Sequence, residues 1–217
     1  MRDPITSFWN LRLEAVKANL EKNHFEVHIA ADREAALALV SDTLLPQIAP
    51  QTLSWGGSKT FVETGLYDRL KAHAGMTVLD TYDTALNNDE KLERRRQALL
   101  VDLFITGTNA ITESGHLINL DMIGNRIAAL TFGPRSVVVL AGRNKVVADL
   151  EAAWERIKGY AAPINSMRLD MKTPCAATGV CHDCKSPQRI CNTWTITEKS
   201  YPQGRVRIVL INEDLGF

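Results

Sequence analysis

Short, largely apolar runs separated by helical stretches restrict the fold of this chain more than any other feature. Four of them, Thr52 to Trp55, Thr77 to Leu79, Leu103 to Thr106 and Val137 to Leu140, have the length of buried strands. Strands that alternate with helices are typical of parallel sheets covered on both faces. We therefore expect a three-layer α/β fold, with these four runs at the centre of a mixed sheet.

Other segments complete this expectation. Leu117 to Asn119 and Ile127 to Thr131 are further strand candidates, and Asn144 to Ile157 has the pattern of a helix. Near the end of the chain, Thr193 to Thr197 and Val206 to Ile211 predict a closing hairpin.

Length and charge restrict the domain organisation and the class of partner. A chain of 217 residues is predicted to hold an α/β domain over 1–165. Residues 166–217 are expected to add a cysteine-rich loop and the closing hairpin, packed on the same domain. Lysine plus arginine equal aspartate plus glutamate at 25 each, which argues against a nucleic-acid binder that relies on overall basicity.

The length of the apolar stretches also indicates in which compartment of the cell the protein is expected. None approaches the length of a membrane-spanning helix, and the first residues lack the apolar core of a secretion signal. We therefore expect a cytoplasmic protein with no membrane partner, in which thiols stay reduced.

All four cysteines lie close together, in the spacing Cys175-x5-Cys181-x2-Cys184-x6-Cys191. Four thiolates suit a zinc ion or an iron–sulfur cluster, because both prefer sulfur ligands. Only Cys181 and Cys184 form the short-spaced pair that structural zinc sites usually use twice, so the spacing favours a [4Fe–4S] cluster over zinc. The alternatives are reduced, buried cysteines without metal, or a disulfide formed after air oxidation.

Three turns follow strand candidates and carry groups that suit an anion. The first is Gly56-Gly57-Ser58-Lys59-Thr60, whose backbone amides precede an expected helix and whose Lys59 adds positive charge. It is not a P-loop, because the spacing of that motif is absent. An ordinary strand-to-helix turn is the alternative.

The second turn runs from Gly107 to Gly115 and includes Thr108, Asn109 and Glu113, with Asn125 further on. Glu113 is the only carboxylate in the turn and is the candidate catalytic base or nucleophile. The alternative is a set of tight turns in which Glu113 is merely solvated.

The third turn, Gly142-Arg143-Asn144-Lys145, is basic, and Lys145 is its expected anion contact. Open α/β sheets bind ligands at the carboxyl ends of their strands. We therefore predict one cleft for a small carboxylate or phosphate. Its predicted ligand-binding residues are Gly56, Gly57, Ser58, Thr108, Asn109, Asn125 and Lys145, with Glu113 as the catalytic group.

The same residues resemble a known family. Gly107 through Arg126, Phe132-Gly133-Pro134 and Gly142 through Lys145 resemble the signature of the LUD domain, in its short lactate-utilisation protein C or YkgG-like form. The resemblance implies an open, Rossmann-like sheet similar to that of sugar-phosphate isomerases and CoA transferases. It also implies a role in the oxidation of L-lactate to pyruvate beside iron–sulfur partner subunits.

The cysteine-rich tail departs from that short form and resembles a subgroup of LUD proteins. We therefore expect a redox-linked protein, acting on lactate or a related 2-hydroxy acid, with its own iron–sulfur cluster. Two alternatives stay open: an acyl- or phosphosugar-handling enzyme that uses Glu113 and a structural zinc, and a non-catalytic assembly subunit. A homodimer is also left open.

Overall fold

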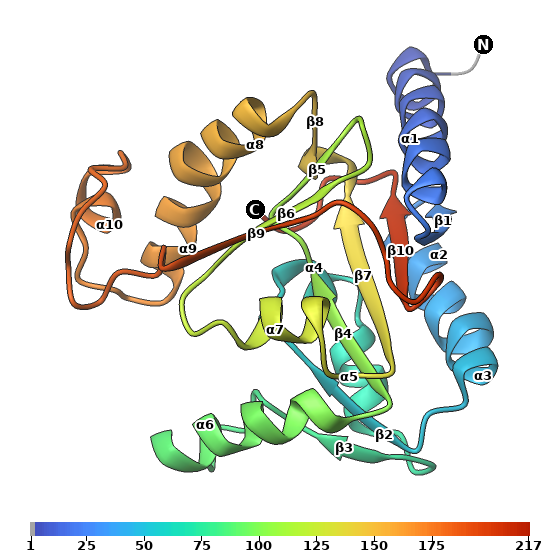
Figure 1. Cartoon of the computed structure of the whole chain (residues 1–217), viewed down its shortest axis with the longest axis horizontal. Helices are drawn as coiled ribbons and strands as arrows, with labels where there is room; N and C mark the ends of the chain where they lie inside the picture. Colours follow the sequence, from blue (N-terminus) through green and yellow to red (C-terminus); the bar gives the residue numbers. More distant parts are fainter. Residues whose placement is uncertain (1–2) are drawn as a thin grey trace.

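A six-stranded, fully parallel sheet forms the centre of the computed structural model, which describes residues 3–217 (Figure 1). Its strands lie in the order β1 (Glu26–Ala30), β10 (Val206–Ile211), β7 (Ser136–Gly142), β4 (Leu103–Gly107), β2 (Thr52–Trp55) and β3 (Thr77–Leu79). No helix in the described residues is long and apolar enough to cross a membrane.

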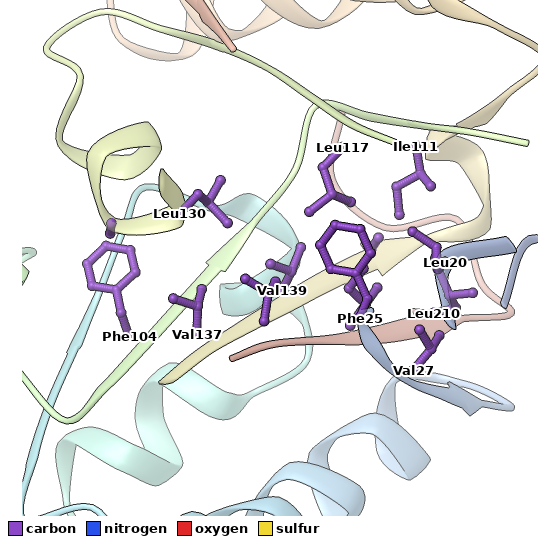
Figure 2. Packing of buried hydrophobic residues seen from close by; sticks show 14 of the residues in the cluster. Leu20, Phe25, Val27, Phe104, Ile111, Leu117, Leu130, Val137, Val139 and Leu210 are labelled. Carbon is purple, nitrogen blue, oxygen red and sulfur yellow. The ribbon is translucent and has the colours of Figure 1, made fainter. Parts of the chain in front are cut away.

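Side chains of the central strands alternate between two apolar layers. Val137 and Val139 of β7 belong to the layer drawn in Figure 2, with Phe104 of β4, whereas Val138 and Leu140 belong to the layer on the opposite face. This two-sided burial explains why the strand runs are apolar rather than alternating with polar residues.

Helices cover both faces of the sheet. On the face shown in Figure 2 lie α1 (Pro4–Lys22) and α7 (Asn125–Thr131). Helix α1 begins at a cap in which the Asp3 carboxylate accepts a hydrogen bond from the Thr6 backbone N–H at 2.8 Å. The helix buries Leu13, Val16 and Leu20. The opposite face is covered by α2 (Arg33–Ala38), the π-helical turn η1 (Leu39–Leu44), α3 (Leu45–Ile48), α4 (Lys59–Glu63) and α5 (Leu66–Lys71).

A second sheet and its helices adjoin the first. Its strands lie in the order β8 (Val146–Val147), β5 (Ala110–Thr112), β6 (Leu117–Asp121) and β9 (Thr193–Thr197). Against it pack α8 (Leu150–Arg156), η4 (Ile157–Ala161) and α9 (Ala162–Arg168) through Ala153, Ile157 and Ala162. The remaining helices are α6 (Asn88–Gln97), η2 (Ala98–Leu100), η3 (Arg143–Lys145) and α10 (Pro174–Thr178).

The three-layer α/β prediction is confirmed, and all four predicted central runs are strands of the main sheet. Thr77–Leu79 lies at the sheet edge rather than at its centre. Ile127 to Thr131 was wrongly predicted as a strand and is part of helix α7, in which Ile127 and Leu130, one turn apart, are both buried. The predicted helix from Asn144 begins only at Leu150, since Val146–Val147 pairs with β5.

The predicted closing hairpin is wrong. Strand β10 lies between β1 and β7 and is parallel to both, whereas β9 pairs antiparallel with β6 in the other sheet. The reason is burial: β10 is apolar on both faces and needs two covering layers, but β9 is half exposed. Residues 166–217 therefore supply a strand to the sheet of the predicted domain 1–165; the boundary itself stays a prediction.

Candidate functional site

A cavity of about 870 Å³ lies at the carboxyl-terminal edge of the parallel sheet. Its lining includes Ser58 after β2, Thr81 after β3, Gly107 at the end of β4 and Lys145 after β7. Because open α/β sheets bind ligands at this edge, the cavity is the candidate functional site.

The cavity brings together most of the residues predicted from the sequence. All the predicted ligand-binding residues except Gly56 line it, namely Gly57, Ser58, Thr108, Asn109, Asn125 and Lys145. The side chains of two of them, Thr108 and Asn109, make hydrogen bonds within the protein. The Thr108 hydroxyl donates to the Ala110 carbonyl at 3.1 Å, and the Asn109 side-chain oxygen accepts from the Leu120 amide at 3.0 Å.

Gly56 lies behind the cavity wall and has a packing role. A Cβ at this position would lie 3.0 Å from Thr106 Oγ1 and 3.1 Å from Phe104 Cε1. The Gly56 carbonyl accepts from the Tyr82 hydroxyl at 2.9 Å. The glycine therefore lets the chain pass close to β4 and places Tyr82 in the cavity lining.

Glu113 does not line the cavity. Its carboxylate forms an ion pair with Arg12 of α1 at 2.7 Å, and its side chain is 49% exposed. The main chain of the same residue donates to the Val147 carbonyl at 2.9 Å. The predicted catalytic role of Glu113 stays a prediction, and the chemistry of this cavity has to come from other groups.

Arg126 organises the wall formed by the second sheet. Its buried guanidinium donates to the carbonyls of Gly107 at 3.2 Å and Leu120 at 2.9 Å, and to the side-chain oxygens of Asn109 and Asn119. Its Nε lies 3.4 Å from Asp121 Oδ2. One side chain thus ties the end of β4 to β6, and it does so because each buried acceptor needs a donor.

Lys145 is the buried cation of the cavity that has no carboxylate partner among residues 3–217. It is 5% exposed, and its Nζ donates to the Thr60 hydroxyl at 2.8 Å. Burial lowers the pKa of Lys145 to about 7; Arg156 and Arg126 act in the same direction, and Glu63 opposes them. Near neutral pH the amine is therefore divided between an ammonium that attracts anions and a neutral nucleophile.

The cavity has a clear excess of positive charge. Its cationic lining residues are Lys59, Arg95, Arg126, Lys145 and Arg168, and Asp121 is the only acidic side chain that lines it within residues 3–217. Asp121 already faces Arg126, and Lys59 lies 3.7 Å from Glu63. In a chain with a net charge of zero, this local excess favours an anionic ligand.

Several of these groups were missed in the sequence. Arg95 lies in α6 and Arg168 in α9, and Tyr82 follows β3. None of them stands in a glycine-rich turn, so no local signal marks them. Thr60 could have been singled out from the sequence, because it follows Ser58 and Lys59 in the first glycine-rich turn.

The segment from Cys175 to Cys191, here called the cysteine segment, lies beside α9 at one end of the molecule (Figure 1). Its four cysteines are free, and Cys175 is buried. Burial raises the pKa of the Cys191 thiol; Lys158 and Arg189 oppose this, and Cys181 and Cys175 add to it. Three of the four sulfurs are therefore near enough to influence one another.

Two cations hold the cysteine segment. Lys158 lies 2.8 Å from the Asp183 carboxylate, and Arg189 lies 3.1 Å from it. Arg189 also donates to the carbonyls of Cys184 and Cys191. The Asp183 amide donates to Cys181 Sγ at 3.5 Å, as amides do to the sulfurs of metal centres.

The sulfurs are nevertheless not assembled around a common point. Within residues 3–217, no group of three or more histidine, cysteine, aspartate or glutamate side chains is placed to hold a metal ion. As arranged, the four thiols do not surround one point, and the segment would have to close further to hold a cluster or a zinc ion.

Comparison with known proteins points to one family. The family model described as LUD domain matches residues 13–211. The fold is similar to the crystal structure of a DUF162 family protein from Deinococcus radiodurans, with a TM-score of 0.52 and 14% identity, over 94% of this chain and 98% of that one. No curated protein matches the sequence.

Proposed function

The chain belongs to the LUD domain family, and from that premise we propose that it binds a small organic anion in the cavity at the carboxyl ends of β2, β4 and β7. The observation that carries this proposal is the unbalanced positive charge of the cavity lining, to which Lys145, Arg95 and Arg168 contribute. Arg95 makes no ion pair within the described residues, and Arg168 donates only to Asn165 Oδ1, at 2.9 and 2.7 Å.

Carboxylates of the 2-hydroxy acid class, lactate included, are the first ligands to test, because the family resemblance implies lactate oxidation. Phosphate esters are the competing class, since the same cations would bind a phosphoryl group. Oxidation of a 2-hydroxy acid releases a pair of electrons, so this role also requires an electron acceptor. Iron–sulfur partner subunits are the acceptors that the resemblance implies.

Calorimetric titration tests the proposal directly. Lactate, pyruvate, sulfate and ribose 5-phosphate are titrated into the full chain at low ionic strength. We expect saturable binding of at least one of them, weakened about tenfold in the Arg168→Ala variant, because a charge-assisted contact contributes about 1.5 kcal/mol or more.

Arg135→Ala is the matched control. Arg135 lines a smaller hollow at the amino-terminal ends of the strands and is well exposed, so its loss should leave the affinity unchanged. Equal losses in Arg168→Ala and Arg135→Ala would mean that only overall charge is sensed. Absence of binding for all four anions would overturn the proposal.

A second candidate function is metal binding by the cysteine segment, an iron–sulfur cluster before zinc. It is favoured by Lys158 and Arg189, which lie near the thiols and would balance the charge of thiolate ligands. A reducing cytoplasm, which we expect for this protein, would keep the four thiols available.

Anaerobic purification followed by iron, zinc and sulfide analysis tests this second candidate. We expect iron with sulfide in the parent protein, and loss of both when Cys181 and Cys184 are replaced by serine. The sheet should survive the double substitution, because the cysteine segment supplies no strand to it. A metal-free parent, or unchanged metal in the variant, would refute metal binding.

A further inference from the structure

We propose that Lys145 forms a covalent imine with the carbonyl group of an anionic substrate held in the cavity. This inference rests on the proposed anion-binding function and narrows its substrate class. The ligand would carry an aldehyde or ketone together with an acid group, as a 2-oxo acid or a phosphorylated sugar does.

The surroundings of Lys145 differ from those of the other buried lysine. Lys158 has a carboxylate partner, Asp183, at 2.8 Å. Burial disfavours its charge, but the hydrogen bond to Asp183 and the nearby Cys181 raise the pKa of Lys158. Within residues 3–217 no carboxylate lies within ion-pair distance of Lys145, whose Nζ donates to Thr60, and burying an unpaired ammonium is costly. A buried lysine is therefore held at a cavity wall without the partner that would keep it charged.

The charged groups that face Lys145 come from three helices. Arg156 of α8 and Arg126 of α7 repel its ammonium form, and Glu63 of α4 attracts it. The Glu63 carboxylate is already engaged, since it accepts the Gly216 amide and lies 3.7 Å from Lys59. The balance leaves a substantial fraction of neutral amine near pH 7, as a nucleophilic lysine requires.

Thr60 positions the amine for attack. Its hydroxyl accepts one Lys145 N–H at 2.8 Å and donates its own hydrogen to the Leu215 carbonyl at 3.2 Å. Because that hydrogen is committed, Thr60 acts as an acceptor toward Lys145. The lone pair of the neutral amine is thus left free for a carbonyl carbon.

The reaction balances without an oxidant or a reductant. The nitrogen lone pair forms a bond to the carbonyl carbon, and the C=O π electrons move to oxygen. That oxygen then leaves as water, and both hydrogens of the water come from the amine. The products are an imine and one water molecule, and hydrolysis restores the free lysine. The acid group of the substrate would be held by cavity cations such as Arg168.

Reductive trapping tests the inference. The full chain is mixed briefly with a small excess of pyruvate, glyoxylate, ribose 5-phosphate or glyceraldehyde 3-phosphate, reduced with borohydride, and examined by intact mass and peptide mapping. We expect one adduct per chain, located at Lys145. The oxo-acid and sugar-phosphate arms show which class is accepted.

Two variants serve as controls. Lys145→Arg keeps the charge and cannot form an imine, so the adduct should disappear. Lys17→Met removes a lysine of α1 that does not line the cavity, so the adduct should remain. If Lys145→Arg does not fold, the mapped position of the adduct in the parent chain still decides the question.

Failure of the imine and failure of anion binding are separable. Sulfate and lactate have no carbonyl group, so their binding is measured on the same preparation. Binding of either without any trapped adduct would refute the imine and leave the proposed function standing. Adducts spread over exposed lysines, with Lys145 unmodified, would also refute it. If no anion binds and no adduct is trapped, both the imine and the proposed function are overturned.

Discussion

Arg12 of α1 and Glu113 of the β5–β6 turn form an ion pair across the surface of the molecule, with 2.7 Å between Nη2 and Oε1. The same turn is held from α1 by Asn19, whose amide nitrogen donates to the Glu113 carbonyl at 2.8 Å. Glu113 therefore helps to join α1 to the second sheet and lies away from the cavity.

Replacing Glu113 by glutamine should leave ligand affinity in the cavity within about twofold of the parent. The expected cost in the free energy of unfolding is below about 1 kcal/mol, because the pair is partly exposed. Calorimetric titration and urea denaturation check the two values. A loss of binding in this variant would restore Glu113 as a functional group of the cavity.

Replacing Arg126 by methionine should destabilise the fold by about 3–5 kcal/mol. The substitution removes one of the donors to each of the Asn109 and Asn119 oxygens, and it leaves the buried Asp121 carboxylate without its cation. Urea denaturation measures the change. Arg96→Met is the control, since Arg96 is exposed and contacts only Glu93; a similar loss there would contradict the assigned role.

Replacing Gly115 by alanine should cost more than about 2 kcal/mol. Its φ of +85° lies in the left-handed region, and a Cβ would come within 2.8 Å of the Leu20 backbone nitrogen. Thermal and urea denaturation measure the effect. Gly159→Ala is the matched control, because a Cβ there meets nothing within 4 Å, and its stability should stay level or rise slightly.

The affinity of the cavity for sulfate should fall as the pH rises above 7. In the free protein the pKa of Lys145 is about 7, and a bound anion favours the ammonium, so binding above that pH takes up a proton. Linkage limits the loss to about tenfold per pH unit. Titrations between pH 6 and 9 in buffers of different ionisation enthalpy measure both the affinity and the proton uptake.

Imine formation should have the opposite pH dependence, since it consumes the neutral amine. The rate of borohydride trapping should therefore rise through pH 7, where sulfate affinity begins to fall. In Lys145→Met the sulfate profile should become flat over this range. A profile unchanged by that substitution would show that another group controls it.

Local pattern in the sequence was enough for the layers of the fold and for part of the cavity. Runs such as Val137 to Leu140 bury side chains on both faces, so their apolar character alone predicts a covered parallel strand. The turns that follow parallel strands meet at one edge, which is why Ser58 and Lys145 both line the cavity.

Tertiary structure alone decided the rest, because it depends on contacts between positions far apart in the chain. Strand β10 lies inside the sheet, between the edge strand β1 and β7, and no local pattern near Val206 specifies those neighbours. Arg168 reaches the cavity through the packing of α9, and Glu113 lies away from it in the β5–β6 turn, where it pairs with Arg12. The sequence determined which segments could become strands and turns, and long-range packing selected which of their side chains meet.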